Sequence, residues 1–282
     1  MWCATWPDSR TDSAAGPVYT PATPVRGIVA RLSGFFPRGV FDACWQFLLF
    51  FLAYNGYQVV RGITDGGREV AFANTERVID VERSLGSYFE AGFQQALIDH
   101  ASWLVDFANF MYLNSHFVIT TGFLAWLYLF RNDNFYFVRN MFMVAMALAL
   151  VGYAVFPTAP PRLFPGEGFT DTIAAFTGVA QDDKTTSLLV NQYAAVPSMH
   201  IAFSLMIAVP AATLSRHVLA RTLWSAYPLL VFFVIVATGN HFWLDAAAGA
   251  AVTCLAALAA SALARLRPAL WSWPDATREA TI

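Results

Sequence analysis

The sequence predicts an all-α, polytopic membrane protein: a bundle of six transmembrane helices with an amphipathic helix on the extracytoplasmic side. Three observations lead to this fold class. Of the 282 residues, 57% are hydrophobic and 13% are charged, whereas soluble domains carry about 25% charged residues. Apolar runs long enough to cross a bilayer recur along the chain. Arginines gather in alternate connections between these runs, which is typical of polytopic membrane proteins.

Six uncharged, mostly apolar runs form the predicted bundle. They cover residues 43–60, 107–130, 140–155, 196–214, 222–238 and 246–264. Each is too long for a strand, and none shows the alternating pattern of a transmembrane β-barrel. The last run is rich in Ala, Gly and Ser, which is typical where helices approach closely. Residues 40–267 are therefore predicted to form one transmembrane domain.

The tails and the arginines predict the orientation of the chain. Residues 1–39 are rich in Pro, Ser, Thr and Arg and residues 268–282 follow the last span, so both are predicted to be cytoplasmic tails, the first of them disordered. Arginines lie in the first tail, in two short connections and after the last span: Arg26, Arg31, Arg38, Arg131, Arg139, Arg216, Arg221, Arg265 and Arg267. With six spans these all lie on one side, which predicts a multi-pass protein of the plasma (cell inner) membrane with both termini cytoplasmic. The two long connections, 61–106 and 156–195, then face outward.

A four-residue period marks the first outer connection. Apolar residues recur at Leu85, Phe89, Phe93 and Leu97, with charged residues between them at Glu82, Arg83, Glu90 and Asp99. This pattern predicts an amphipathic helix lying on the membrane surface. Two roles are open for it: a cap over the bundle, or a lid that guides a lipid toward a site.

Composition also excludes several classes of function. The net charge of −2 gives no electrostatic reason to expect a nucleic-acid partner. The three cysteines, Cys3, Cys44 and Cys254, lack the spacing of a metal site or a disulfide framework. We therefore expect neither a zinc finger nor a disulfide framework. No motif indicates a cofactor, so none is expected, and the sequence leaves the oligomeric state open.

Three polar segments lie at the predicted outer edge of the bundle. They are Pro-Thr-Ala-Pro-Pro-Arg at 157–162, Ala-Ala-Val-Pro-Ser-Met-His at 194–200 and Thr-Gly-Asn-His-Phe-Trp-Leu-Asp at 238–245. Polar residues at the membrane are costly and mark functional sites by default. Because three such segments meet at one depth, we expect a catalytic site there.

The residue types suit phosphoryl transfer. His241 and Asp245 are four residues apart at a helix start, so the carboxylate can fix the tautomer of the imidazole and leave one ring nitrogen as a nucleophile. His200 can then protonate the leaving oxygen. Arg162 offers a planar fork suited to phosphate oxygens.

Further residues are candidates for binding. Ser198 and the backbone amides at Gly239 and Asn240 are candidate donors to the phosphate. Five residues are candidates for lining the acceptor side of the site, with a structural role equally open: Asn191, Tyr193, Tyr112, Asn114 and His116.

The motifs PSMH at 197–200, GNHFWLD at 239–245 with Gly249, and PTAPPR at 157–162 resemble the signature blocks of the type 2 phosphatidic acid phosphatase superfamily. The run between them is most similar to the inositol phosphorylceramide synthase-like (inositolphosphotransferase) branch, which has many actinobacterial members. The resemblance implies a six-helix core, no metal and a phosphohistidine intermediate on His241. It also implies that Asp245 orients the nucleophile, that His200 is the acid/base, and that Arg162 and Ser198 hold the phosphate.

Two positions depart from the superfamily pattern. Val155 and Ile235 stand where the broad superfamily has a lysine and an arginine. Fewer cations suit a phosphodiester or a transfer reaction better than a dianionic monoester. The sequence therefore predicts a lipid-phosphate phosphatase or phosphotransferase, with the lipid head group and the acceptor open. The alternatives are an intramembrane serine protease using Ser198 with His241, and a non-catalytic lipid-binding protein.

Overall fold

The computed structural model describes residues 36–63, 67–178 and 193–266, with side chains from 58 to 63 left aside. Residues 1–35 of the predicted tail at 1–39, the whole predicted tail at 268–282, and Asn191 lie outside this part. The chain divides into two compact units, Met1–Cys44 and Trp45–Ile282. Every site discussed below lies within the second unit.

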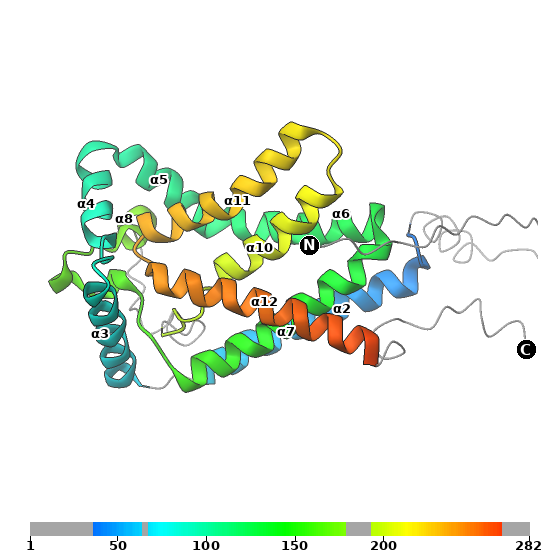
Figure 1. The fold of residues 1–282 in the computed structure, drawn as a ribbon, viewed down its shortest axis with the longest axis horizontal. Coiled ribbons are helices and arrows are strands. Elements are labelled where there is room, and N and C mark those ends of the chain that lie inside the picture. Colours follow the sequence, from blue (N-terminus) through cyan, green and yellow to red (C-terminus); the bar gives the residue numbers. More distant parts are fainter. Residues whose placement is uncertain (1–35, 64–66, 179–192, 267–282) are drawn as a thin grey trace, which may run out of the picture. The chain divides into compact units, whose positions relative to one another are not determined.

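Helices make up the described part of the chain (Figure 1). The longer ones are α2 (Gly39–Ile63), α3 (Arg68–Ser84), α4 (Glu90–His100), α5 (Ser102–Phe110), α6 (His116–Phe130), α7 (Asn132–Val155), α10 (Met199–Leu214), α11 (Val218–Ala237) and α12 (Trp243–Leu266). Shorter elements are the π-helix η1 (Met111–Ser115), the 3₁₀ turns η2 (Pro161–Leu163) and η3 (Pro165–Glu167), and α8 (Thr172–Thr177). An isolated bridge joins Thr158 to Ala194.

Each predicted apolar run coincides with a helix, apart from a residue or two at some ends. Four helical segments in the described part are long and apolar enough to cross a membrane: Ser102–Phe130, Asn132–Val155, Val218–Ala237 and Trp243–Leu266. The run predicted from residue 196 becomes helical only at Met199, because Pro197 and its neighbours form the extended approach to α10, a shorter apolar helix. The prediction of an all-α membrane protein is confirmed at this level, and the six-span count stays a prediction.

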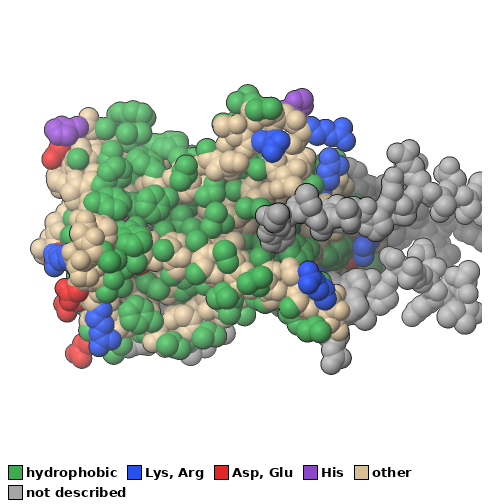
Figure 2. All heavy atoms as spheres, in the orientation of Figure 1, with side chains coloured by type: hydrophobic (Ala, Val, Ile, Leu, Met, Phe, Trp, Pro, Cys, Tyr) green, Lys and Arg blue, Asp and Glu red, His purple; other side chains and the backbone are tan. Residues whose placement is uncertain are grey.

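The outer surface of the helices is apolar. Large side chains such as Leu229 and Leu258 are more than half exposed although they lie well inside long helices. Figure 2 shows that hydrophobic side chains cover the middle of this face. Arginines gather at the end where the α6–α7 and α10–α11 turns lie (Figures 1 and 2). The apolar belt suits the hydrocarbon interior of a bilayer, and the charged end suits its aqueous boundary.

The amphipathic pattern at 82–99 does not form one surface helix. α3 ends at Ser84 and α4 begins at Glu90, so the four-residue period runs across a break. Leu85 is 61% exposed, whereas Glu82 and Glu90 are fully buried. The pattern misled at Glu82 and Glu90 because these two carboxyl groups have partners in a distant part of the chain, so they are buried rather than exposed.

α7, α10 and α12 pack against one another, and glycine allows the closest approach. A Cβ at Gly249 in α12 would overlap the carbonyl group of Ser198, just before α10. At Gly152 in α7 it would lie 2.7 Å from the Cδ of Pro197. Small residues serve this purpose between membrane helices.

Gly249→Ala is therefore expected to destabilise the protein by about 2 kcal/mol, because backbone rather than a flexible side chain must move. The measurement is thermal unfolding in detergent. Gly122→Ala in α6 is the matched control, since nothing lies within 4 Å of the added methyl group and alanine favours a helix. Equal melting temperatures for the two variants would contradict this account of the α10–α12 contact.

Candidate active site

The segment that carries Arg162 is held from three sides. Thr75 of α3 exchanges hydrogen bonds with the backbone of Ala159, both at 3.0 Å. Asn74 donates to the carbonyl of Pro157 at 2.9 Å. On another side, the amide of Thr158 donates to the carbonyl of Tyr193 at 2.9 Å. α3 thus supports the proline-rich segment through the buried side chains of Asn74 and Thr75.

Arg162 itself makes the contacts on the third side of the proline-rich segment. Its amide donates to the carbonyl of Gly239 at 2.7 Å, and its guanidinium donates to the side-chain oxygen of Asn240. Its Nε lies 3.8 Å from a carboxylate oxygen of Asp171, which caps α8. Arg162 is 9% exposed, so its charge acts in a medium of low dielectric constant, where it attracts an anion strongly.

Gly239 and Asn240 serve a different role from the one expected. Their amides donate to the carbonyls of Val236 and Ile235, and Gly239 has a φ of +62°, which is the Schellman ending of α11. Their N–H groups are thus already bonded and do not point to a phosphate. The expectation of backbone donors at these two positions is wrong, and the pair instead positions Arg162.

Ser198 lies beside the acidic member of the third polar segment. Its amide donates to the carbonyl of Asp245 at 3.0 Å, which joins the start of α10 to the start of α12. Its hydroxyl is fully buried and has no hydrogen-bond partner among the described residues. A buried hydroxyl is costly without a partner, and a phosphate oxygen is a suitable one.

His241 and Asp245 meet as the spacing predicts. The Nδ1 of His241 lies 3.3 Å from Oδ2 of Asp245. The same oxygen accepts the amide of Phe242 at 2.9 Å, which fixes the carboxylate in the first turn of α12. His241 is 5% exposed and Asp245 is fully buried. This arrangement holds Nδ1 against the carboxylate and leaves Nε2 for chemistry.

His200 stands between this pair and an aromatic group. Its ring centroid is 5.6 Å from that of His241, 4.5 Å from that of Tyr112 and 4.7 Å from that of His116. Tyr112 belongs to η1, and a π-helix inside a long helix often marks a functional site.

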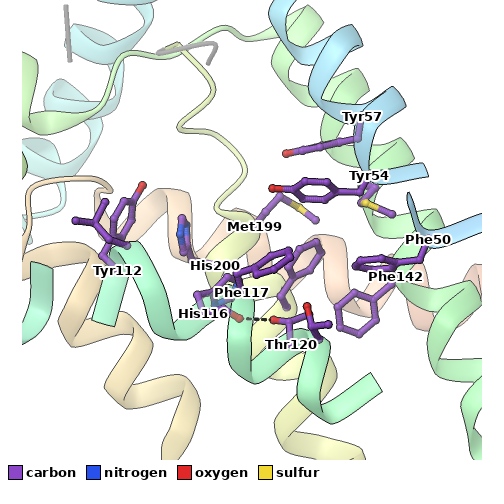
Figure 3. A pocket seen from close by; sticks show the side chains of 14 residues that line it. Phe50, Tyr54, Tyr57, Tyr112, His116, Phe117, Thr120, Phe142, Met199 and His200 are labelled. Carbon is purple, nitrogen blue, oxygen red and sulfur yellow. Dashed lines mark hydrogen bonds between the residues drawn. The ribbon is translucent and has the colours of Figure 1, made fainter. Parts of the chain in front are cut away.

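A cavity of about 210 Å³ opens beside His200 (Figure 3). Tyr112, His116 and His200 line it together with apolar and aromatic side chains of α2, α6, α7 and α10. Figure 3 shows His200 between Tyr112 and His116, with Phe50, Tyr54 and Tyr57 on the opposite side of the cavity. The cavity therefore joins a polar end at the histidines to an apolar interior.

The other candidates for the acceptor side have separate positions. Asn114 is exposed and donates to the carbonyl of Phe110 in its own helical segment, so it does not line the cavity. Tyr193 packs edge-on against Phe72 of α3, with ring centroids 6.4 Å apart. Asn191 lies outside the described residues.

Four polar residues at this site, three of them buried, are not predicted as site residues by the sequence. Asp171 lies beside Arg162, and Gln94 joins α4 to the carbonyls of Thr170 and Ala237. Glu82 and Glu90 bind the amides of Leu244 and Trp243. Their partners are distant in the sequence, so local spacing carries no signal for them.

The comparisons with known proteins agree with the motifs. A family model described as the PAP2 superfamily matches residues 76–259, more than half of the chain and a range that contains all three polar segments. Neither a curated protein nor a solved structure matches the chain significantly. With its apolar helices and this match, the chain belongs to the PAP2 superfamily of type 2 phosphatidic acid phosphatases.

Proposed function

We propose that this protein is a membrane lipid-phosphate phosphatase or phosphotransferase that works through a phosphohistidine at the outer membrane face. Family membership supports the phosphatase or phosphotransferase type of function. The observation that carries the finer proposal is the buried His241–Asp245 pair with the ring of His200 5.6 Å away.

In the first step, Nε2 of His241 attacks phosphorus. A nitrogen–phosphorus bond forms, the bond from phosphorus to the leaving oxygen breaks, and His200 gives its proton to that oxygen. Asp245 accepts the hydrogen bond from Nδ1–H and stabilises the positive charge that develops on the imidazole. Arg162 and Ser198 donate to the other phosphate oxygens.

In the second step, water or an acceptor hydroxyl attacks the phosphohistidine. His200, now neutral, takes the proton of the attacking oxygen as the nitrogen–phosphorus bond breaks. Hydrolysis and transfer share the first step and differ only in this acceptor. The residues that carry the chemistry are therefore the same for both reactions.

The charges around the phosphate favour a substrate of low charge. Asp171 lies near the guanidinium of Arg162, and the buried carboxyl groups of Glu90 and Asp245 lie at the start of α12. A phosphodiester, with one negative charge, meets less repulsion here than a dianionic monoester. This supports the inositolphosphotransferase-like branch that the motifs resemble.

The membrane supplies the substrate in this proposal. Six spans with both termini in the cytoplasm place the three polar segments at the outer face of the plasma membrane. A lipid reaches the site laterally between helices, and the cavity beside His200 takes the apolar part next to the reacting phosphate.

A serine protease is less well supported by the same geometry. Ser198 Oγ has no hydrogen-bond partner among the described residues, so it is not paired with His241 as an activated nucleophile is paired with its base. That reading also leaves Arg162 without a role.

The test is incubation of the purified protein with a panel of lipid phosphates: phosphatidic acid, polyprenyl phosphates, phosphatidylglycerophosphate and phosphoinositol-bearing lipids. Mass spectrometry scores free phosphate (from a monoester) or a phosphorylated head group (from a diester) against new lipids, with His241→Ala as the blank. We expect turnover of at least one lipid by the wild type and none by the blank. Full activity in the blank would contradict the proposed mechanism.

A further inference from the structure

Two carboxyl groups from the outer connection cap the helix that carries Asp245. Glu90 Oε1 accepts the amide of Trp243 at 2.9 Å, and Glu82 Oε1 accepts the amide of Leu244 at 3.1 Å. These are the first two amides of α12, which have no partner within their own helix. Both glutamates are fully buried. They therefore supply, from α3 and α4, the cap that α12 does not supply for itself.

The capped residues lie between the two catalytic candidates. Trp243 and Leu244 follow His241 and precede Asp245 in the chain. Fixing their amides fixes the backbone turn across which Nδ1 of His241 meets the carboxylate at 3.3 Å. The glutamates act through this turn.

Three carboxyl groups in one buried cluster cannot all carry a charge cheaply. The second oxygen of Glu82 is buried and accepts no hydrogen bond from the described residues. Burial raises the pKa of Glu82 from 4.5 to about 8, the amide of Leu244 opposes this, and the charges of Glu90 and Asp245 raise it further. Glu82 therefore holds a proton at neutral pH.

The surrounding charges leave this proton in place. Glu90 from α4 and Asp245 from α12 are the charged groups that act on Glu82. The neighbouring Arg83 pairs with Glu167 and lies over the ring of Tyr88, away from the cap. Burial and the Glu167 carboxylate raise the pKa of Tyr88, so its phenol stays neutral.

We propose that Glu82 and Glu90 are positioning residues: a carboxyl pair that caps α12, carries a proton on Glu82, and keeps His241 and Asp245 aligned only while that proton is present. Because this rests on the proposed function, its consequence is a lipid-phosphate activity that falls as pH rises through about 8. Loss of the proton puts a second charge into the cap and pushes the carboxyl groups apart.

Stability follows the same proton. The pKa of Glu82 in the folded protein is about 8, whereas its ordinary value is 4.5. Between pH 4.5 and about 8, the folded chain therefore keeps a proton that the unfolded chain has already released. The stabilising effect of this proton is complete below that window, declines as pH rises through it, and is gone above it.

The experiment compares wild type with Glu82→Gln and Glu82→Ala between pH 6 and 9, by activity and by thermal unfolding. Glutamine keeps the acceptor for Leu244 and replaces the carboxyl proton with an amide N–H. We expect Glu82→Gln to keep activity at pH 7 within about threefold and to lose both the alkaline fall in activity and the pH dependence of melting. Glu82→Ala is expected to lose on the order of 100-fold in kcat, since the turn is no longer held.

Glu76→Gln is the matched control, because Glu76 is an exposed residue of the same helix α3. It should behave as wild type in every assay. The same alkaline fall in Glu82→Gln as in wild type would overturn the proposal, as would a folded but inactive Glu82→Gln at pH 7. If the wild type turned over no lipid phosphate, the proposed function would fail. The pH dependence of the melting temperature would still test whether Glu82 carries the proton.

Discussion

Replacement of His241 by alanine is expected to lower kcat for the lipid phosphate by at least roughly four orders of magnitude, as loss of a covalent nucleophile does in other enzymes. The imidazole is 5% exposed and lies against Asp245, so water has little room to replace it as a nucleophile. The change removes a side chain without adding bulk. The measurement is single-turnover release of the leaving alcohol.

His217→Ala is the matched control for this variant. His217 is exposed, and it precedes α11 without a side-chain hydrogen bond to the helix start. It should keep wild-type activity. A comparable loss in both variants would show that the effect of His241→Ala is not specific to the nucleophile.

Asp245→Asn is expected to lower kcat by roughly 10³- to 10⁴-fold, as the same change does in an enzyme whose carboxylate orients a catalytic histidine. One oxygen of Asp245, Oδ2, both faces Nδ1 of His241 and accepts the Phe242 N–H. With the asparagine NH₂ at that position, the bond to Phe242 is lost, and the NH₂ favours the tautomer of His241 with the proton on Nε2. That nitrogen then has no lone pair for attack.

Nitrogen NMR of labelled histidine reads the tautomer directly, and kcat reads its consequence. The control is Asp80→Asn, an exposed residue of α3. Unchanged kcat in Asp245→Asn, or a lost activity with an unchanged tautomer, would contradict the orienting role of Asp245.

The sequence was sufficient for the helices and for the three polar segments. Long apolar runs have few alternatives to a membrane helix, which is why each run coincides with one in the structure. The i, i+4 spacing of His241 and Asp245 likewise brings their side chains together wherever a helix begins there. These are local properties of the chain.

The features that the sequence did not predict depend on contacts between segments far apart in the chain. The amides of Gly239 and Asn240 looked available because the ending of α11 could not be placed to the residue. Glu82 and Glu90 looked like the polar face of a surface helix, since nothing near them in sequence indicates that α12 lacks a cap. Asp171 belongs to the site because its segment packs against Arg162, a contact that its position in the sequence does not reveal.

Trapping of the intermediate tests the central claim most directly. The protein is mixed with a p-nitrophenyl phosphate ester, whose leaving group needs no proton, and quenched in alkali, where phosphohistidine survives. His200→Ala serves beside the wild type, because loss of the base should slow the second step and let the intermediate accumulate. Peptide mass spectrometry then locates the phosphoryl group. The account predicts that it lies on His241, at a higher level in His200→Ala than in wild type, and that it is absent in His241→Ala. A phosphoryl group on Ser198 or His200, or an equal level in His241→Ala, would contradict it.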